Sequence, residues 1–285
     1  MFFDTQLMNY PAASCEVSES KPRDCQEVTR FTPQQAARNS LIKQALRLEG
    51  GRQNARIGRD MSQIITIDGL SGVGKSTVAG QVARKLGYQH IDTGATYRAI
   101  AWKAMRNCID SEEIDCLILL AERTHIELSM HPTISMLSVA VDGLEITTEI
   151  RADDVTVFAT VISKISEVRH LLARLQRQMV ADCEYGVVIE GRDTGAVVCP
   201  EAQTKIVLAA SPEERARRRH GELHGRGLDV DLHRLLANHQ ARDAWLELAN
   251  GSPLVTAAEA IVIQTDHLSI EKVVREIISI HRTSR

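Results

Sequence analysis

The chain has 285 residues, of which 44% are hydrophobic and 25% charged, and its formal net charge is −3 at pH 7. This length can bury a substantial core, as one domain with insertions or as two small domains. The small net charge gives no reason to expect a nucleic-acid or membrane partner held by bulk charge.

The cysteines form no C-x-x-C pair and show no zinc-finger spacing to a histidine, so we expect a reduced, cytoplasmic protein. No apolar run approaches the roughly 20 residues needed to cross a bilayer. The first residues, MFFDTQLMNYP, lack the basic and apolar regions of a secretory signal. The six cysteines are Cys15, Cys25, Cys108, Cys116, Cys183 and Cys199.

Residues 1–60 contain no run typical of a strand, and we expect a flexible or partly helical N-terminal extension. Residues 33–48 have apolar side chains at helical spacing, which permits an amphipathic helix. A surface helix or a disordered tail is expected there, and a partner-binding helix is the alternative. Met61 stands directly before the first strand, so translation beginning there is also open, and 61–285 is the expected folded domain.

The stretch 64–77, IITIDGLSGVGKST, places a β-branched apolar run directly before a glycine-rich turn and a helical pattern. It matches the Walker A pattern G-x-x-x-x-G-K-[ST], whose backbone N–H groups cradle phosphate oxygens. We expect Lys75 to reach the β- and γ-phosphates of ATP and the Ser76 hydroxyl to take one position on Mg²⁺. A glycine-rich turn that matches by accident is the alternative. The predicted ATP-binding residues are Gly69, Ser71, Gly72, Val73, Gly74, Lys75, Ser76 and Thr77.

The next segment, 88–98, reads YQHIDTGATYR and follows Gly87, which we expect to end the helix after the phosphate loop. An aspartate and an arginine this close to a phosphate loop, Asp92 and Arg98, suggest organisation of metal-bound water and a second phosphate site. The segment by itself is weak evidence.

Residues 126–146 alternate apolar and polar side chains in places, and Asp142-Gly143 favours a hairpin turn. We expect a small, half-exposed sheet inserted between helices. The pattern over 149–178 is helical again, with one buried face. Its remaining surface carries arginines, most of which would merely be solvated: Arg169, Arg174 and Arg177.

A second buried strand is predicted at 186–189, and it places Glu190, Arg192 and Asp193 at its carboxyl end. Ligands bind at this edge of open α/β sheets. A carboxylate there can hold water on Mg²⁺, which makes Glu190 a candidate metal residue. A turn with an ion pair is the alternative.

A third buried strand, 206–210, leads into Ser211, Pro212 and Glu214, which is a capping box with proline at the first helical position. The following helix carries arginines that repel one another, and an anionic ligand would remove this cost. A lid that closes on a triphosphate is therefore favoured over a solvated helix face. The arginines are Arg215, Arg217, Arg218 and Arg219.

The C-terminal part predicts a helix at 231–247, a short strand at 261–263 and a helix capped by Ser269. The last helix keeps one apolar stripe of Ile270, Val273, Val274, Ile277 and Ile278. Strands that alternate with helices throughout imply an α/β protein with a parallel central sheet and right-handed crossovers.

Six segments taken together resemble the bacterial cytidylate (CMP/dCMP) kinases, a family of P-loop nucleoside monophosphate kinases. They are DGLSGVGKST, IDTGATYRA, VDGLEITTEIRADDVTVFATVISKISEVR, GVVIEGRDTGAVVCPEA, KIVLAASPEERARRR and RDAWLELANGSPL. The resemblance covers about residues 62–281, and the inserted hairpin region and the GRD motif separate it from adenylate and guanylate kinases. It implies a three-layer P-loop NTPase fold with an NMP-binding insertion at about 93–178 and an arginine-rich lid at about 212–230.

The resemblance implies a monomer that transfers the γ-phosphoryl group of ATP, with Mg²⁺, to CMP or dCMP, with no nucleic-acid or membrane partner. It places Thr93, Arg169 and Asp193 at the cytosine ring. It places Arg98 and Arg192 at the acceptor phosphate, and Thr160 and Arg242 at the sugar. Asp92 completes the expected substrate site, and the expected catalytic set is Lys75, Arg98, Arg192, Arg215 and Arg218.

One motif departs from the family pattern R-D-x-x-D-x-x-R-x-x-x-P-L. Leu246 and Ala249 replace its second Asp and second Arg, and Gln264 stands where the family usually has Asp. The carboxylate lost at Leu246 would weaken a contact at the sugar and the arginine lost at Ala249 one at the acceptor phosphate, each typically about 1.5–3 kcal/mol. A weakly active nucleotide-binding paralogue, a kinase for another nucleotide such as UMP, and a compensating residue such as Glu247 are therefore open. The spacing of Arg242, Asp243, Pro253 and Leu254 is kept.

Overall fold

A computed structural model describes residues 63–130, 137–225, 227–248 and 257–284 of the chain, with Met130, Arg242 and 244–248 described by their backbone alone. These residues all lie within one compact unit, Arg59–Arg285. The helix expected at 33–48 and the start at Met61 lie outside the described residues. Among the helices that the structure describes, none has the length and apolar character that crossing a membrane requires.

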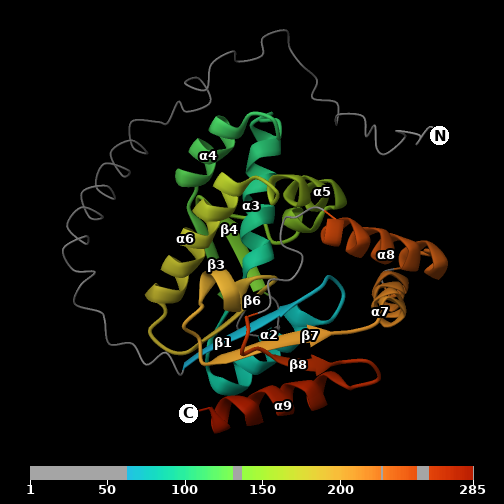
Figure 1. Cartoon of the computed structure of the whole chain (residues 1–285). Helices are drawn as coiled ribbons and strands as arrows, with labels where there is room; N and C mark the ends of the chain where they lie inside the picture. The colour runs from blue at the N-terminus through green and yellow to red at the C-terminus, as the bar shows by residue number, and fades with distance from the viewer. Residues whose placement is uncertain (1–62, 131–136, 226, 249–256, 285) are drawn as a thin grey trace. The chain divides into compact units, whose positions relative to one another are not determined.

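Five strands form the central sheet in the order β2-β6-β1-β7-β8 (Figure 1). Every neighbouring pair is parallel, which confirms the predicted sheet. The strand predicted at 186–189 extends to residue 191 and so includes Glu190. The strands are β1 (Ile64–Gly69), β2 (Gln89–Asp92), β6 (Val187–Gly191), β7 (Thr204–Ala209) and β8 (Ile261–Gln264).

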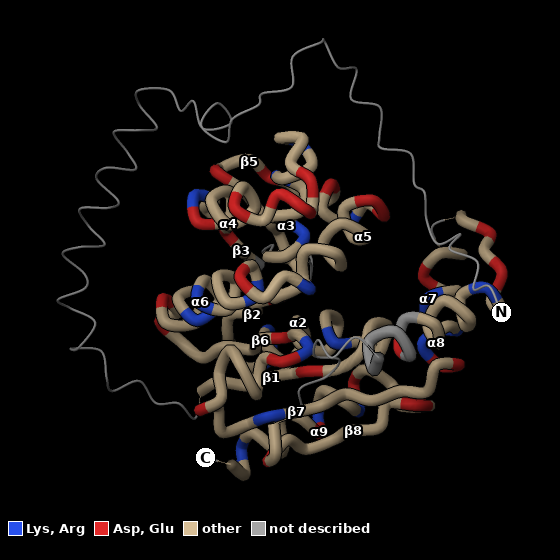
Figure 2. Tube along the Cα trace, turned by 45° about the horizontal axis from the view of Figure 1, so that its top comes forward, with Lys and Arg blue, Asp and Glu red and all other residues tan. Residues whose placement is uncertain are grey.

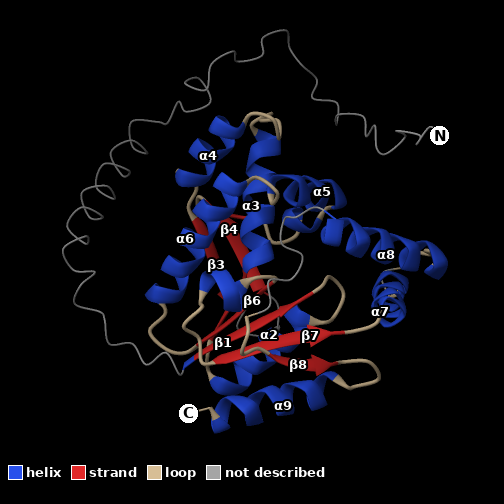
Figure 3. Cartoon of the chain, viewed as in Figure 1, coloured by secondary structure: helices blue, strands red, loops and turns tan. Residues whose placement is uncertain are grey.

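Side chains of β1 alternate between two cores, one on each face of the sheet. Ile65 and Ile67 pack with apolar residues of α2 (Lys75–Leu86) and α9 (Ile270–Thr283). Ile64 packs in the opposite core with residues of β6 and of α6 (Ser166–Asp182). Figure 3 shows α2 and α9 on one side of the sheet and α3 (Thr93–Arg106) and α6 on the other, which confirms the three-layer α/β fold.

The ends of two helices follow the sequence prediction with one correction. Gly87 has φ 69° and closes α2 in the left-handed conformation that glycine tolerates. Ser269 caps α9 by accepting a hydrogen bond from the Lys272 N–H at 3.3 Å. The apolar stripe of α9 begins one turn later than predicted, because Ile270 in the first turn is 44% exposed whereas Val273 is buried.

The predicted insertion is a three-stranded antiparallel sheet between helices. Asp142 and Gly143 have φ of 52° and 83°, as a two-residue hairpin turn requires. The helical stretch predicted at 149–178 is broken into three pieces, η4, α5 and α6. The elements are α4 (Ile114–Glu122), β3 (Ile126–Met130), β4 (Leu137–Val141), β5 (Leu144–Glu145), η4 (Glu149–Arg151) and α5 (Asp153–Ile162).

Two helices, α7 (Pro212–His224) and α8 (Leu232–Leu248), pack on each other and follow β7 in the chain. The capping box predicted for α7 is half present. The Ser211 hydroxyl accepts a hydrogen bond from the Glu214 N–H at 3.2 Å, but the Ser211 N–H donates to Asp266 at 3.1 Å. The Glu214 carboxylate binds Arg217 and Arg218 instead, because a carboxylate bonds more strongly to a guanidinium than to a neutral N–H.

Candidate nucleotide-binding site

The loop between β1 and α2 has the shape of a phosphate cradle. A Cβ atom on Gly69 would lie 2.5 Å from the Leu208 carbonyl oxygen, so no side chain fits there. Gly72 and Gly74 have φ of 84° and 96°, which favours glycine and turns successive N–H groups inward. Gly74 is the N-cap residue of α2, whose N-terminus adds positive potential. The loop therefore fits a polyphosphate.

Lys75 lies at the centre of this cradle. Its Nζ atom donates a hydrogen bond to the Leu70 carbonyl at 2.9 Å. Burial lowers the pKa of Lys75, the Glu190 carboxylate opposes this shift, and the positive charge of Arg192 acts in the same direction as burial. The charge of Arg192 thus acts on Lys75, and its predicted role at the acceptor phosphate stays a prediction.

The possible metal residues lie beside the loop. The Ser76 hydroxyl donates to Glu190 Oε2 at 3.1 Å, and Glu190 is 2% exposed. Hydroxyl and carboxylate oxygens suit Mg²⁺, which keeps several waters and is bound through few protein groups and substrate phosphates. Within the part of the chain that the structure describes, no group of three or more metal-ligating side chains occurs. Ser76 and Glu190 thus fit an ion held mainly by the nucleotide.

His90 is a site residue that the sequence reasoning missed. Its Nε2 atom lies 3.1 Å from Glu190 Oε1, and the ring is 4% exposed. Burial opposes protonation, but the hydrogen bond and the negative charge of Glu190 outweigh it and raise the pKa of His90. The signal was the spacing, because His90 and Asp92 are two apart on β2 and so point to the same face.

Asp92 and Arg98 form a guanidinium–carboxylate pair at the carboxyl end of β2. Asp92 accepts hydrogen bonds from the Ala95 N–H at 3.0 Å and from Arg98 Nη2 at 2.8 Å. Burial raises the pKa of Asp92, but the positive charges of Arg98 and His90 outweigh this and bring the pKa below its usual value. Among the described residues, the buried Arg98 Nε has no hydrogen-bond partner. Arg98 therefore keeps one buried donor that is not used by another described residue.

Arg169 and Asp193 form the second pair, although they are far apart in sequence. Arg169 Nη2 lies 2.5 Å from Asp193 Oδ2. Tyr97 lies near this pair and was not among the predicted site residues. Burial raises the pKa of Tyr97 to about 12; the charge of Arg169 lowers this pKa, and the charge of Asp193 raises it. Its position in the segment IDTGATYRA, beside Arg98, was the available signal.

Two other predicted substrate residues, Thr93 and Thr160, donate hydrogen bonds to main-chain carbonyls of the protein. The Thr93 hydroxyl donates to the Glu190 carbonyl at 2.8 Å, and its oxygen lone pairs can still accept. The Thr160 hydroxyl donates to the Thr156 carbonyl at 2.9 Å within α5. Arg242 lies in α8 with its side chain outside the description, and Ala249 lies outside the described residues. The substrate-binding roles of Thr93, Thr160 and Arg242 stay predictions.

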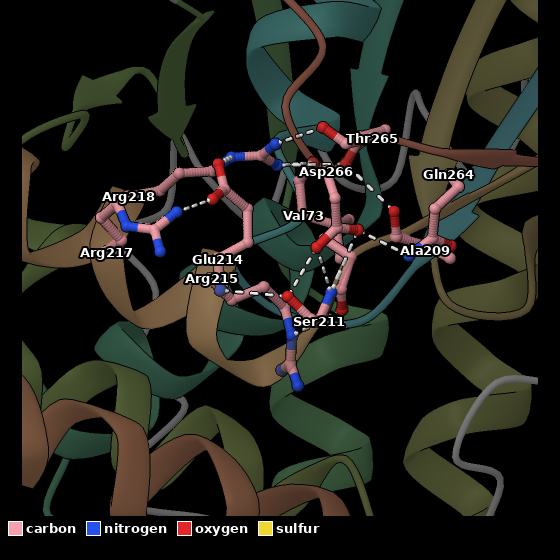
Figure 4. A network of polar contacts seen from close by, with 11 residues as sticks. Val73, Ala209, Ser211, Glu214, Arg215, Arg217, Arg218, Gln264, Thr265 and Asp266 are labelled. Carbon is pink, nitrogen blue, oxygen red and sulfur yellow. Dashed lines mark hydrogen bonds and ion pairs between the residues drawn. The ribbon is translucent and has the colours of Figure 1, made fainter.

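Two arginines of α7 contact the phosphate loop directly. Arg215 is 1% exposed and donates to the Ser71 carbonyl at 3.4 Å and to the Asp243 carboxylate at 3.2 Å. Arg218 donates to the Val73 carbonyl at 3.0 Å and to the Thr265 carbonyl at 2.6 Å (Figure 4). The helix and the loop are thus joined by charged donors on main-chain oxygens.

The expected repulsion along α7 is offset within the protein. Glu214 binds Arg217 and Arg218, and Glu222 binds Arg219 at 3.2 Å. Figure 2 shows both signs of charge along this helix. The repulsion that was taken to favour an anionic ligand is therefore already offset by intrahelical carboxylates, and it no longer supports a lid. The lid role itself stays a prediction.

Gln264 stands where the family usually has Asp, and a carboxylate lies nearby. Gln264 Nε2 donates to Asp266 Oδ2 at 2.5 Å, and Asp266 accepts from the Ser211 hydroxyl at 2.5 Å (Figure 4). The hydrogen bond from the Ser211 hydroxyl lowers the pKa of Asp266. An acidic side chain two residues further along therefore anchors the start of α7 to the end of β8.

A glycine-rich phosphate loop between β1 and α2, with a carboxylate at the end of the adjacent β6 and an arginine-bearing helix on the loop, defines a P-loop phosphotransferase. The family model for cytidylate kinase matches residues 65–283, and the chain belongs to this family.

Curated relatives agree with this assignment. The cytidylate kinase of Desulforamulus reducens is 46% identical over 215 residues, which covers 75% of this chain and 95% of that protein. The cytidylate kinase of Pelotomaculum thermopropionicum is 43% identical and covers 75% of this chain and 94% of that protein. A solved gluconokinase from Sinorhizobium meliloti 1021 has TM-score 0.41 and 15% identity, covering 79% of this chain and 94% of that chain. Similarity at this last level carries no argument about activity.

Proposed function

We propose that this protein transfers the γ-phosphoryl group of ATP to CMP and dCMP, which gives ADP with CDP or dCDP. One observation carries the proposal: the phosphate loop with Lys75 follows β1, and two guanidinium–carboxylate pairs, Asp92–Arg98 and Arg169–Asp193, lie at or just beyond the carboxyl ends of β2 and β6 in the same parallel sheet. Such a site suits two anionic nucleotides bound face to face. The identity to the curated cytidylate kinases supports cytidine nucleotides as acceptors.

The chemistry needs alignment and charge neutralisation more than covalent participation. Lys75 would neutralise charge on the β- and γ-phosphates, and Arg98 and Arg192 would hold the acceptor phosphate in bidentate geometry. The attacking phosphate oxygen is largely ionised at neutral pH, since the second pKa of a phosphate monoester is about 6, so no general base is required. Mg²⁺, held by Ser76 and through water by Glu190, would supply further charge neutralisation when bound.

Arg215 and Arg218 would stabilise the charge of the group in transfer. Both arginines donate to main-chain carbonyls of the phosphate loop, Arg215 to Ser71 and Arg218 to Val73, which supports this role because the loop would hold the phosphates. A charged donor that is already positioned needs little reorganisation during the reaction.

Base selection would rest on Arg169 and Asp193. A carboxylate suits the exocyclic amine of cytosine, and a guanidinium suits its ring nitrogen and carbonyl. The two side chains fix each other at 2.5 Å, so both are oriented before a nucleotide binds. Uracil offers a carbonyl in place of the amine, and we expect it to be disfavoured beside Asp193.

A coupled assay of ADP release with CMP, dCMP, UMP and AMP tests the proposal. Lys75→Ala serves as the blank, because it removes the loop cation. We expect turnover with CMP and dCMP well above this blank, and dependence on Mg²⁺ that EDTA abolishes. Activity on none of the four nucleotides would end the kinase proposal, and activity on UMP alone would replace the acceptor.

The departures at Leu246 and Ala249 favour a weakly active paralogue, but the curated relatives do not favour that alternative. We expect Leu246→Asp and Ala249→Arg to raise turnover if the lost contacts limit the enzyme. An unchanged rate in the double variant would mean that other groups, such as Glu247, already compensate.

The proposal also includes a cytoplasmic monomer whose catalytic unit is 61–285, with an acceptor-binding insertion at about 93–178 and a lid at about 212–230. Size-exclusion chromatography with light scattering tests the monomer. Comparing a chain that begins at Met61 with the full chain tests whether residues 1–60 contribute, and equal kinetics would assign catalysis to 61–285 alone.

A further inference from the structure

Asp68 is a buried carboxylate that the mechanism above does not use. It lies on β1 directly before Gly69, the first residue of the phosphate loop, and is 3% exposed. It accepts hydrogen bonds from the Thr194 N–H at 2.9 Å, the Thr194 hydroxyl at 2.8 Å and the Gly195 N–H at 2.8 Å. The strand β1, which leads into the phosphate loop, is thus hydrogen-bonded to a turn that follows it by more than a hundred residues in the sequence.

The turn that Asp68 holds is η5 (Thr194–Val198), which directly follows Arg192 and Asp193. Its other end is also fixed, because Arg177 donates to the carbonyls of Val197 and Val198. Arg192 and Asp193 therefore connect β6 to a turn that is held at one end by Asp68 and at the other end by Arg177. Any movement of this turn changes where Arg192 and Asp193 point.

The turn also lies close against the sheet. A Cβ atom on Gly195, in the turn, would lie 2.8 Å from the hydroxyl oxygen of Thr66 on β1. A contact this short leaves no room for the turn to approach β1 further. The hydrogen bonds to Asp68 prevent it from moving away.

We propose that Asp68 is a positioning residue for the acceptor nucleotide: it fixes the turn that aims Arg192 and Asp193, although it belongs to the strand that carries the donor loop. This inference rests on the proposed function. It makes β1 a shared support of both nucleotide sites.

The chemistry of the carboxylate supports this role. An ionised aspartate has only acceptor sites and can receive all three donors of the turn. Burial raises the pKa of Asp68, and the hydrogen bonds from Gly195 and Thr194 favour its ionised form. An asparagine of the same shape would turn an N–H group toward an N–H or O–H donor, and would lose at least one of the bonds.

The test uses Asp68→Asn and Thr194→Val, with Thr66→Val as the matched control. Thr66 lies on the same face of the same strand, and among the described residues its buried hydroxyl has no hydrogen-bond partner. Steady-state kinetics would give KM for CMP and for ATP separately. Isothermal titration of CMP and of ATP would measure binding without turnover, and urea unfolding would report the folded fraction.

We expect Asp68→Asn to weaken CMP binding about tenfold or more, as loss of hydrogen bonds to a charged group does, and to leave ATP binding within about twofold. Thr194→Val should weaken CMP binding severalfold, Thr194→Ser should restore it, and Thr66→Val should change neither nucleotide. If Asp68→Asn does not fold, the comparison of Thr194→Val with Thr194→Ser tests the inference in its place. Unchanged CMP affinity in a folded variant, or equal loss for both nucleotides, would overturn the inference.

Failure of the function and failure of the inference give different results. A wild-type protein that phosphorylates CMP, with Asp68→Asn unchanged in CMP affinity, sinks the inference alone. A wild-type protein that binds CMP without transferring phosphate sinks the function, and the binding comparison still decides the inference. A wild-type protein that does not bind CMP overturns both.

Discussion

The proposed donor and acceptor sides of this molecule are built in different ways. The donor side is one contiguous loop, Gly69–Ser76, whose phosphate groups would meet main-chain N–H groups and one lysine. The proposed acceptor side gathers side chains from β2, α3, α6 and the residues after β6, and its charged groups pair with one another: Asp92 with Arg98, and Arg169 with Asp193. Backbone geometry makes the first, and pairs of charged side chains make the second.

This difference predicts how each side responds to substitution. A loop that binds through its backbone is damaged mainly where its one charged side chain or a required glycine changes. An acceptor site built from paired side chains is damaged by any change that frees a partner, even one that does not touch the nucleotide. The predictions below test this contrast, beginning with the largest effect.

The largest effect should follow loss of the loop cation. Lys75→Ala removes a positioned charge next to the transferring group, and we expect kcat to fall about 100- to 1,000-fold or more. Stopped-time assays of ADP release measure it. Lys85→Ala, an exposed lysine in the last turn of the same helix, should leave kcat within about twofold. A near-normal kcat in Lys75→Ala would contradict the role of the loop lysine in the proposed ATP site.

The next effect should separate the two sides. Asp193→Asn removes the charge that holds Arg169, and we expect kcat/KM for CMP to fall about 10- to 100-fold with KM for ATP little changed. Initial rates at varied CMP and at varied ATP measure the two constants. Asp182→Asn, at an exposed position on the same helix as Arg169, serves as control. Equal losses of kcat/KM for CMP and for ATP would mean that the proposed donor and acceptor sites do not respond independently.

A third effect concerns stability where α7 and α8 meet the loop. Asp243→Asn leaves the guanidinium of Arg215, which is 1% exposed, without its carboxylate. We expect the free energy of unfolding to fall by about 1–3 kcal/mol, since a buried charge loses its partner. Urea unfolding measures it, with Asp229→Asn as the exposed control. A change below about 0.5 kcal/mol would show that Arg215 finds another acceptor.

The smallest effect is a pH dependence of stability. The pKa of Asp92 is lower in the folded protein than in the unfolded chain, so Asp92 contributes stability above its unfolded value of about 4. This contribution is lost as the pH falls through the lower folded pKa. In urea titrations from pH 5 to pH 3, the wild type should lose more stability than Asp92→Asn. Parallel curves for the two proteins would contradict the shift.

Much of the fold could be predicted from local patterns. The buried strands at 64–69, 187–191 and 204–209, the glycine that ends α2 and the turn at Asp142-Gly143 all follow from residue type and periodicity. The phosphate loop was readable because its function resides in consecutive residues. These features need only the preferences of neighbouring residues along the chain.

Tertiary structure decided the rest, because the deciding partners lie far apart in sequence. The capping box at Ser211 was half right since Asp266, 55 residues away, competes for its N–H, and no local rule contains that contact. His90 and Asp68 entered the site only when parallel strands placed them beside Glu190 and Thr194. Sequence thus determined which segments become strands, helices and the loop. Folding determined which buried charges meet, because burial makes an unpaired charge costly and so selects partners by distance in space.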